Sequence, residues 1–490
     1  MTALVPIMNA SIVPRVGSRG TRVRGLTLVE MLVSMTLTLL LMGAVAQLFG
    51  ILGQGVNGSR SVAELNDRMR ATAYRLRQDL EGMTVDLSGT PPLSGSKNSG
   101  YLEIIEGPAS DAVAYANTAG GQFFSTASGT AGPTAASDDR LVGDIDDVIL
   151  FTTHATGDMF TGRADTRNNN TEGGGMRSPY AEVAWFCLKN DLSSNPQTYT
   201  LYRRQRLVMA HPGAEPFANT TAGGTATNSF GGPPNALPFS NWETIYGLTD
   251  VSCRRQGNIV LPNTLADLGR RENRFMHLGT FPYTFPIPLY ASASQVSDLT
   301  FPSSSARFGE DIILTNVIAF DVRVWDPAAW VQAIPGYLQT GAVSGTTTML
   351  AAVPGDPGYG GPNAVNALQG AYVDLFWSRT PVASGFSGKG AAVSNAPNLD
   401  TLQDGNVLVG TASYDTWTDF YEVNGADDDG DNVADDGSNR LDDNANGLVD
   451  EITERETMPP YSAPLKGMQV RLRCFEPSSR QVRQITIDTF

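Results

Sequence analysis

The stretch RGLTLVEMLVSM, residues 24–35, places a single acid, Glu30, at the start of a long apolar run. From Met31 to Gly53 no side chain is charged, which gives 23 consecutive uncharged residues. At about 1.5 Å of rise per residue, a helix of this length crosses the hydrocarbon core of a bilayer. A carboxylate there costs about 2.5–3.5 kcal/mol, so Glu30 requires a partner or a position at the membrane edge.

The leader before the apolar run is basic. Residues 1–25 contain four arginines and no acid. Basic residues favour the cytoplasmic side of a membrane, so the C-terminal bulk of the chain is predicted to lie on the other side. A secretory signal is the alternative, because Ala44-Val45-Ala46 supplies an A-x-A cleavage site. Cleavage after Ala46 would leave Gln47 as the first residue.

The longer stretch RGLTLVEMLVSMTLTLLL resembles the N-terminal methylation motif of type IV pilins and type II secretion pseudopilins. The resemblance implies that a prepilin peptidase removes residues 1–25 by cutting between Gly25 and Leu26. It also implies that the new amino terminus on Leu26 is methylated, which makes Glu30 the fifth residue of the mature chain. The implied partner of Glu30 is the amine of Leu26 on a neighbouring subunit during filament assembly.

Such a pair would make Glu30 an alignment device. It offsets the desolvation of the carboxylate only when the two subunits meet in the correct register. The rival interpretation is an acid that reaches the lipid headgroups and has no further role.

Residues 61–83, SVAELNDRMRATAYRLRQDLEGM, follow a segment with four glycines. Their apolar positions are spaced by threes and fours, which predicts a helix that packs on a sheet by one stripe, with Asp79 and the other charged residues elsewhere. The glycines predict a joint where the helix bends or locally melts. Residues 26–86 are therefore predicted to form a transmembrane half and an amphipathic half. The stripe consists of Val62, Leu65, Met69, Ala73, Leu76, Leu80 and Met83.

Residues 87–490 are predicted to form a β-rich body. The 51 glycines and 29 prolines favour turns and short strands. The predicted fold class is α+β, with a long N-terminal helix packed on an antiparallel, pilin-like body that carries large loop insertions. Strands are predicted at residues 146–154, 181–189, 199–209, 311–327 and 371–377, with a terminal hairpin of 467–477 and 480–490. Loop insertions are predicted at residues 117–137, 213–238 and 341–369.

The order of these elements carries a second resemblance. The helix, AEVAWFCL with TLYRRQRLV, VIAFDVRVWD and QVRLRCF follow one another as in J-type minor pseudopilins and their pilus-tip relatives. This similarity covers scattered strands and carries no defining motif.

An acidic double repeat lies within residues 424–454. Its two copies are offset by fifteen residues, and each reads D-x-[DN]-x-[DN]-[NG]-x-x-D. Oxygen ligands at this spacing suit calcium, and the pattern resembles EF-hand-like and thrombospondin-type loops. Position twelve holds Ser438 and Thr453 rather than glutamate, and an acidic solvated linker is the alternative. The candidate calcium ligands are Asp427, Asp429, Asp431 and Asp435 in one copy, and Asp442, Asn444, Asn446 and Asp450 in the other.

Several classes of function are disfavoured. The net charge of −16 argues against a nucleic-acid binder. The arginines at 203, 204 and 206 and those at 270, 271 and 274 are interpreted as solvated faces. Three distant cysteines without a C-x-x-C and three histidines without H-x-x-x-H argue against a transition-metal enzyme. No catalytic motif with supporting context is found, so a non-enzymatic role is expected.

The resemblance to pilins and pseudopilins therefore implies that the chain is a minor pseudopilin or minor pilin. It would be inserted in the bacterial inner membrane by one span, with its body in the periplasm, and would initiate or cap a type II secretion pseudopilus or type IV pilus-like filament. The expected partners are prepilin peptidase, other pilin or pseudopilin subunits, the membrane and secreted cargo. The alternatives are a Sec-secreted extracellular calcium-binding protein cut after Ala46 and a secreted enzyme on a pilin-like anchor.

Overall fold

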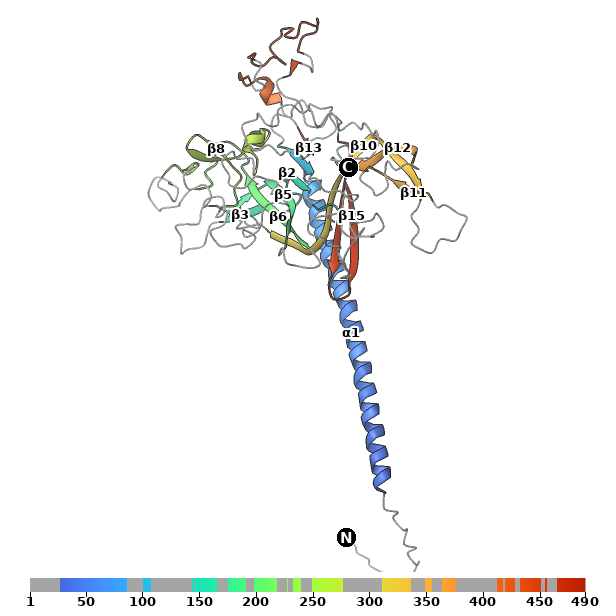
Figure 1. Ribbon diagram of the computed structural model, residues 1–490. Coiled ribbons are helices and arrows are strands. Elements are labelled where there is room, and N and C mark those ends of the chain that lie inside the picture. Colours follow the sequence, from blue (N-terminus) through green and yellow to red (C-terminus); the bar gives the residue numbers. More distant parts are fainter. Residues whose placement is uncertain are drawn as a thin grey trace, which may run out of the picture. The chain divides into compact units, whose positions relative to one another are not determined.

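Figure 1 shows the computed structural model of the chain. The chain divides into two compact units, Met1–Arg60 and Ser61–Phe490, and each is described by itself. The described residues are 27–85, 100–106, 143–145, 147–164, 175–190, 198–217, 227, 232–238, 249–275, 311–335, 349–354, 364–375, 412–416, 419–427, 432–450, 454–455 and 465–489.

The first element, α1 (Leu28–Glu81), is a helix of 54 residues, drawn in blue in Figure 1. It stays helical through the four glycines between residues 50 and 58, so the predicted local melting there is wrong. A glycine costs about 0.5–1 kcal/mol relative to alanine in a helix, whereas an unpaired backbone group in lipid costs several kcal/mol. Keeping the helical hydrogen bonds is therefore favourable. The boundary between the two units nevertheless falls just after these glycines.

In the second unit, α1 contributes one apolar face to the main core. The predicted stripe is confirmed, because its central members are at most 6% exposed and share a cluster with the sheet strands. Met83 packs against the same cluster from just beyond the helix end. The buried members are Leu65, Met69, Ala73, Leu76 and Leu80.

Asp79 also lies on the buried side of α1, contrary to the prediction that it would lie away from the sheet. Its side chain is 2% exposed. The carboxylate accepts hydrogen bonds from the Arg203 guanidinium at 2.7 and 2.9 Å and from Trp185 Nε1 at 3.0 Å. The main-chain oxygen of Asp79 accepts one from Thr153 Oγ1 at 2.7 Å. This charged cluster fixes the end of α1 on the sheet.

The interpretation of the arginine clusters as solvated faces is wrong for the whole of the first cluster and for Arg274 of the second. Arg274 is 1% exposed, and its Nη1 lies 2.6 Å from Asp415 and 3.2 Å from Glu103. It thereby ties the segment 249–275 to two neighbouring strands of the sheet. In a buried ion pair of this kind, the attraction between the two charges offsets the hydration that they lose. The buried arginines of the two clusters are Arg203, Arg204, Arg206 and Arg274.

In the described part of the second unit, ten strands form the main sheet, with neighbouring strands antiparallel. Its order is β13-β1-β2-β5-β6-β10-β14-β15, and β11 and β12 also pair with β10. The long strand β10 (Asp311–Pro335) makes this branching possible. It pairs first with β6, then with β14, and finally with β11 and β12, and its register shifts near Asn316, where φ is +58°.

The fold class predicted from the sequence is confirmed: a long N-terminal helix followed by a large antiparallel body. The strands of the main sheet are β1 (Leu102–Glu106), β2 (Val148–His154), β5 (Tyr180–Lys189), β6 (Tyr199–Val208), β10, β11 (Met349–Ala352), β12 (Val365–Val373), β13 (Ala412–Asp415), β14 (Met468–Glu476) and β15 (Gln481–Thr489). The predicted strands at 146–154, 181–189 and 199–209 and the terminal hairpin are confirmed. β10 is longer than predicted and continues to Pro335, whereas β12 begins at Val365 and ends at Val373, so it lies mostly before the predicted strand 371–377.

The described residues also form two smaller sheets and short helices. One small sheet pairs β3 with β4, and the other has the order β7-β9-β8. Of the three predicted loop insertions, 117–137 lies outside the described residues. The insertion at 213–238 contains β7, and the one at 341–369 contains β11 and the start of β12. The remaining elements are β3 (Phe160–Arg163), β4 (Gly175–Ser178), β7 (Leu237–Pro238), β8 (Cys253–Gln256), β9 (Ile259–Pro262), α3 (Leu265–Leu268), η2 (Arg271–Asn273) and η6 (Asp419–Glu422).

Candidate functional site

The start of α1 is a capping box built from Thr27 and Glu30. The Thr27 amide and hydroxyl donate to Glu30 Oε2 at 2.9 and 3.0 Å, and the Glu30 amide donates to Thr27 Oγ1 at 3.3 Å. Thr27 was missed as a functional residue, although T-x-x-E before an apolar run is a signal for this cap. The contact orients Glu30 within its own chain. In the described part of the chain, Glu30 Oε1 has no partner, so it remains available to a cation from outside.

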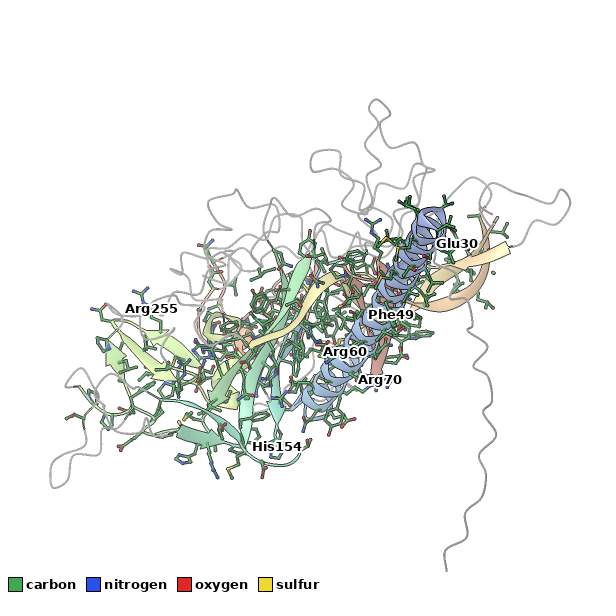
Figure 2. The ribbon with its side chains drawn as sticks, turned by 90° about the horizontal axis from the view of Figure 1, so that it is seen from below. Glu30, Phe49, Arg60, Arg70, His154 and Arg255 are labelled. Carbon is green, nitrogen blue, oxygen red and sulfur yellow. The ribbon has the colours of Figure 1, made fainter. Side chains whose placement is uncertain are left out.

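The apolar half of α1 leaves few polar groups unsatisfied. Ser34, Thr36 and Thr38 donate to carbonyl oxygens three or four residues earlier, at 2.6–3.1 Å. Side-chain hydroxyls bonded in this way are tolerated in lipid because they present no free donor. Between Leu28 and Val56, the large apolar side chains are 43–78% exposed. Figure 2 labels Glu30 and Phe49 on this half of the helix.

This segment of α1 is long and apolar enough to cross a membrane. The predicted processing residues Gly25 and Leu26 precede it and lie outside the described residues. Of the residues predicted to take part in processing and assembly, the structure therefore places Glu30.

The acidic double repeat folds twice in the same way. Asp427 accepts from the Asn432 amide at 2.9 Å, and fifteen residues later Asp442 accepts from the Gly447 amide at 2.8 Å. Both donors have positive φ, +77° and +91°, as a sharp turn at the sixth position requires. The internal symmetry predicted from the sequence is therefore present in the backbone.

Two further hydrogen bonds repeat at the same offset. Asp435 accepts from the Gly425 amide at 2.9 and 3.0 Å, and Asp450 accepts from the Arg440 amide at 2.7 Å. Asn424 and Asn439 likewise each accept from the amide two residues later. These carboxylates and side-chain amides stabilise the turns of each loop.

Six of the eight candidate calcium ligands lie in the described part of the repeat, and Asp429 and Asp431 lie outside it. Among the described residues, no group of three or more acidic, histidine or cysteine side chains has the arrangement of a metal site. The main-chain amide of Asn444 donates to Glu454 Oε1 at 3.1 Å, and that of Asn446 donates to Asp442 Oδ1 at 2.9 Å. The calcium assignment stays a prediction.

The repeat rests on the segment that Arg274 fixes to the sheet. Tyr421, just before the repeat, donates to Glu272 Oε2 at 2.9 Å. The neighbouring Phe420 ring lies under the Arg270 guanidinium, 4.6 Å from the ring centroid. These contacts attach one end of the acidic insertion to the body.

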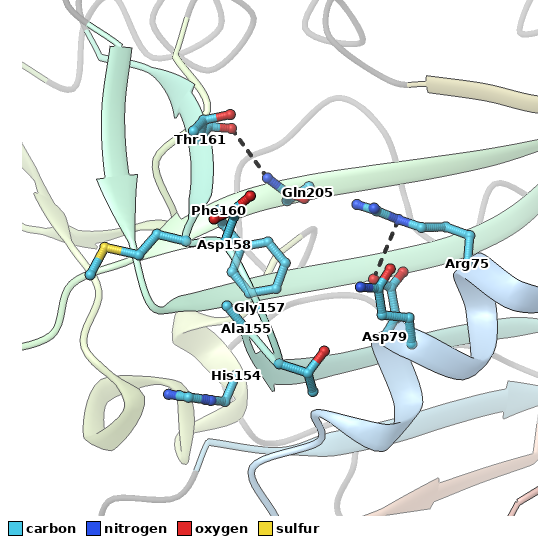
Figure 3. Close-up of a pocket in the computed structure, with 12 residues that line it drawn as sticks. Arg75, Asp79, His154, Ala155, Gly157, Asp158, Phe160, Thr161 and Gln205 are labelled. Carbon is cyan, nitrogen blue, oxygen red and sulfur yellow. Dashed lines mark hydrogen bonds and ion pairs between the residues drawn. The ribbon is translucent and has the colours of Figure 1, made fainter.

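A cavity of about 330 Å³ lies beside the end of α1 (Figure 3). Arg75, Asp79, His154 and Asp158 contribute its ionisable side chains. His154 makes an edge contact with the Tyr180 ring, 5.2 Å between centroids. In the described part of the chain, its imidazole has no hydrogen bond to an acid or a hydroxyl group, so the cavity presents no histidine that is oriented as a catalytic base.

The three cysteines are free thiols buried in the body. Burial raises the pKa of Cys253 and Cys474 to about 12 and raises that of Cys187 well above its usual value. Thiols in this state are poor nucleophiles and poor metal ligands.

Comparison with known families gives one match. Residues 20–46 fit the family model described as the prokaryotic N-terminal methylation motif. No curated protein and no solved structure gives a significant match. The matched range includes Gly25, Leu26, Thr27 and Glu30, and it confirms the resemblance of this N-terminal segment to the pilin and pseudopilin superfamily. It ends before the body, so the J-type resemblance stays a prediction.

Proposed function

Because its N-terminal segment is that of the pilin and pseudopilin superfamily, we propose that this chain is a minor pseudopilin or minor pilin. Prepilin peptidase would cut between Gly25 and Leu26 and methylate the new terminus. The apolar half of α1 would then leave the inner membrane to enter a filament, while the body stands on the periplasmic side. The work of such a subunit is mechanical: it initiates or caps the filament and requires no catalytic group.

The observation that carries this proposal is the match at residues 20–46 together with the geometry of Glu30. The carboxylate sits in the first turn of α1, where Thr27 holds one oxygen and the other is available. A methylated amine on a neighbouring subunit supplies a cation for that oxygen. Since an unpaired carboxylate in lipid is costly, this contact favours one axial position of one helix against the next.

The body supports a role at the end of a filament rather than along its length. Among the described residues, its main sheet has ten strands, and the body also contains two smaller sheets and the acidic repeat. Bulk of this kind is easier to accommodate at a tip, where fewer neighbours surround the subunit. Its strand and loop surfaces would contact other minor subunits or secreted cargo.

The deciding experiment is N-terminal sequencing with intact-mass measurement of the protein purified from membranes. We expect a first residue Leu26 that carries one added methyl group. The Gly25→Ala variant should retain the leader and the unmodified mass. A first residue Gln47 would instead show cleavage after Ala46 and support the Sec-secreted alternative.

We further propose that the acidic double repeat binds calcium in a structural role. Between residues 427 and 451 the chain carries ten acids and one base, and these charges repel one another in the absence of cations. The repeated loop geometry, with positive φ at Asn432 and Gly447, supports two equivalent sites. The alternative is an acidic surface insertion held by its own hydrogen bonds.

Calcium binding is tested by the melting temperature with and without a chelator. The wild-type protein should melt at a lower temperature after chelation, and Asp442→Ala should reduce this difference. Asp443→Ala is the matched control, since it removes an adjacent acid that is not part of the ligand pattern. An equal melting temperature with and without the chelator would leave the acidic-insertion alternative.

A further inference from the structure

The cavity beside the end of α1 has a composition that the filament role does not use. It is lined by the last turns of α1, the end of β2, the loop between β2 and β3, the start of β3, and β6. Arg75 and Gln78 come from the helix, and Gln205 comes from β6, as Figure 3 shows for Arg75 and Gln205. The loop residues 156–159 are exposed and form the rim, so the cavity opens to the surface.

Arg75 is a cation with spare hydrogen-bonding capacity. In the described part of the chain, its ion-pair partner is Asp79, with Nε 3.7 Å from Oδ1, beyond hydrogen-bonding distance. The Asp79 oxygens are already occupied by Arg203 and Trp185 at 2.7–3.0 Å. The Arg75 side chain is 42% exposed, so its guanidinium can reach a molecule in the cavity.

The electrostatic surroundings of Arg75 favour an additional anion. Burial and the neighbouring Arg203 guanidinium lower the pKa of Arg75, and Asp79 and Asp311 offset this effect only in part. A guanidinium does not lose its proton in a protein, so Arg75 stays charged despite its partial burial and the neighbouring Arg203. A carboxylate placed against Arg75 would stabilise that charge.

The other lining residues suit a carboxylate on an aliphatic stem. The Gln78 amide, which has no hydrogen-bond partner among the described residues, supplies donors beside Arg75. Met159, 56% exposed, and the half-buried Phe160 supply apolar contact area at the rim. A flexible methionine at an open rim adapts well to a peptide chain. Asp158, also at the rim, repels an incoming carboxylate and therefore weakens its binding.

We propose that this cavity binds an acidic side chain of a partner protein, with the carboxylate paired to Arg75 and the peptide lying across Met159 and Phe160. Arg–carboxylate pairs form two parallel hydrogen bonds when both donors of the fork are free, which would give the contact a defined geometry. The site is formed entirely by the second unit, so it does not depend on filament assembly.

The test measures fluorescence anisotropy of a labelled peptide with the full-length protein in phosphatidylcholine nanodiscs. The probe is fluorescein-GSEGEGS with an amidated C-terminus, and its comparison peptide has glutamine in place of both glutamates. We expect the acidic peptide to bind and the glutamine peptide to bind at least tenfold more weakly. Equal binding of the two peptides would overturn the proposal.

Three variants locate the site. Arg75→Gln should weaken acidic-peptide binding about tenfold, whereas Arg77→Gln, which removes an exposed arginine of α1 outside the cavity, should leave it unchanged. Asp158→Asn should strengthen binding by about two- to fivefold, because it removes a repulsive charge at the rim. This gain also keeps the test valid if Arg75→Gln disturbs folding. Equal weakening by the two arginine variants, or no gain from Asp158→Asn, would exclude this cavity.

Succinate distinguishes a peptide from a small carboxylate. Displacement of the peptide by succinate only at a large excess supports the peptide as the natural form of the ligand. Thermal stabilisation by succinate without any binding of the acidic peptide would overturn the assignment to a protein partner. Because the assay contains no filament, its failure would not affect the proposed assembly role.

Discussion

Asp79 on α1 and Arg203 on β6 form a two-pronged ion pair inside the body, with Nε–Oδ2 at 2.7 Å and Nη2–Oδ1 at 2.9 Å. Each side chain is 2% exposed. The pair lies near the end of the helix that would carry the load of assembly. It therefore resists sliding of α1 along the sheet, since any shift would leave two buried charges unpaired.

Removing Asp79 should strongly destabilise the body. We expect Asp79→Ala to lower the free energy of unfolding by about 3–5 kcal/mol, because Arg203 stays buried without its counterion. Urea unfolding in detergent, followed by tryptophan fluorescence, measures the loss, and Trp185 bonds directly to Asp79. Asp67→Ala, an exposed acid of the same helix, should change stability by less than about 0.5 kcal/mol. Comparable losses for both variants would show that the ion pair contributes little.

The environment of Asp250 leads us to expect that the free energy of unfolding depends on pH. Burial would raise the pKa of Asp250, but hydrogen bonds from Arg163 and the charge of Arg204 lower it well below its usual value. The contacts are short, at 2.8–3.1 Å. A carboxyl whose pKa is lowered by folding stabilises the folded state at pH values above its pKa in the unfolded chain, which is about 4. This stabilisation is lost progressively as the pH falls from about 4 toward the lower pKa of the folded state.

The measurement compares wild-type protein with Asp250→Asn from pH 7 to pH 2. The variant should be less stable at pH 7, and the difference in urea midpoint should shrink steadily below about pH 4. Asp158→Asn, at an exposed position, serves as the control and should follow the wild-type curve. A difference that stays constant over this range would contradict the role of the ionised Asp250.

The cysteines should be inert in the folded protein. Burial raises the pKa of Cys253 and Cys474 to about 12, so almost no thiolate is present at pH 7.5. Native protein should therefore not react with a maleimide, whereas protein in urea should react at three thiols. Thr156→Cys, at an exposed position of the loop after β2, should add one thiol that reacts at once. Labelling of wild-type thiols on the same timescale would contradict their burial.

The elements predicted correctly are those that depend on residues close together in the sequence. The stripe from Leu65 to Leu80 and the hairpin of β14 and β15 follow from helical spacing and from alternation around a turn, and both are confirmed. The buried arginines could not be found in this way. Arg203 meets Asp79 across 124 residues, and Arg274 meets Glu103 across 171. Taken alone, each arginine looks like one on a solvated surface.

Long-range pairing also explains the missed strands. β1 is short and pairs with β13 through Glu103 and Asp415, whose separation in sequence exceeds that of any local motif. At the candidate assembly site, the motif itself indicated Glu30, but the prediction considered only a partner on another subunit. The T-x-x-E pattern would have predicted the hydrogen bonds between Thr27 and Glu30, because it is typical of a helix cap formed within one chain.

Glu30 provides the last prediction, which concerns assembly rather than folding. Glu30→Val should leave the protein in the membrane, since the substitution makes α1 more apolar, but should remove it from the filament. Membrane fractionation measures the first property, and immunodetection in sheared, purified filaments measures the second. Glu64→Gln is the control, because it removes an exposed acid of α1 that pairs with Arg68 and lies beyond the apolar run. Glu30→Gln separates charge from shape: it keeps an oxygen for Thr27 but presents no anion to a neighbouring amine. If either Glu30 variant entered filaments at the wild-type level, pairing of this carboxylate could not be what sets the register between subunits.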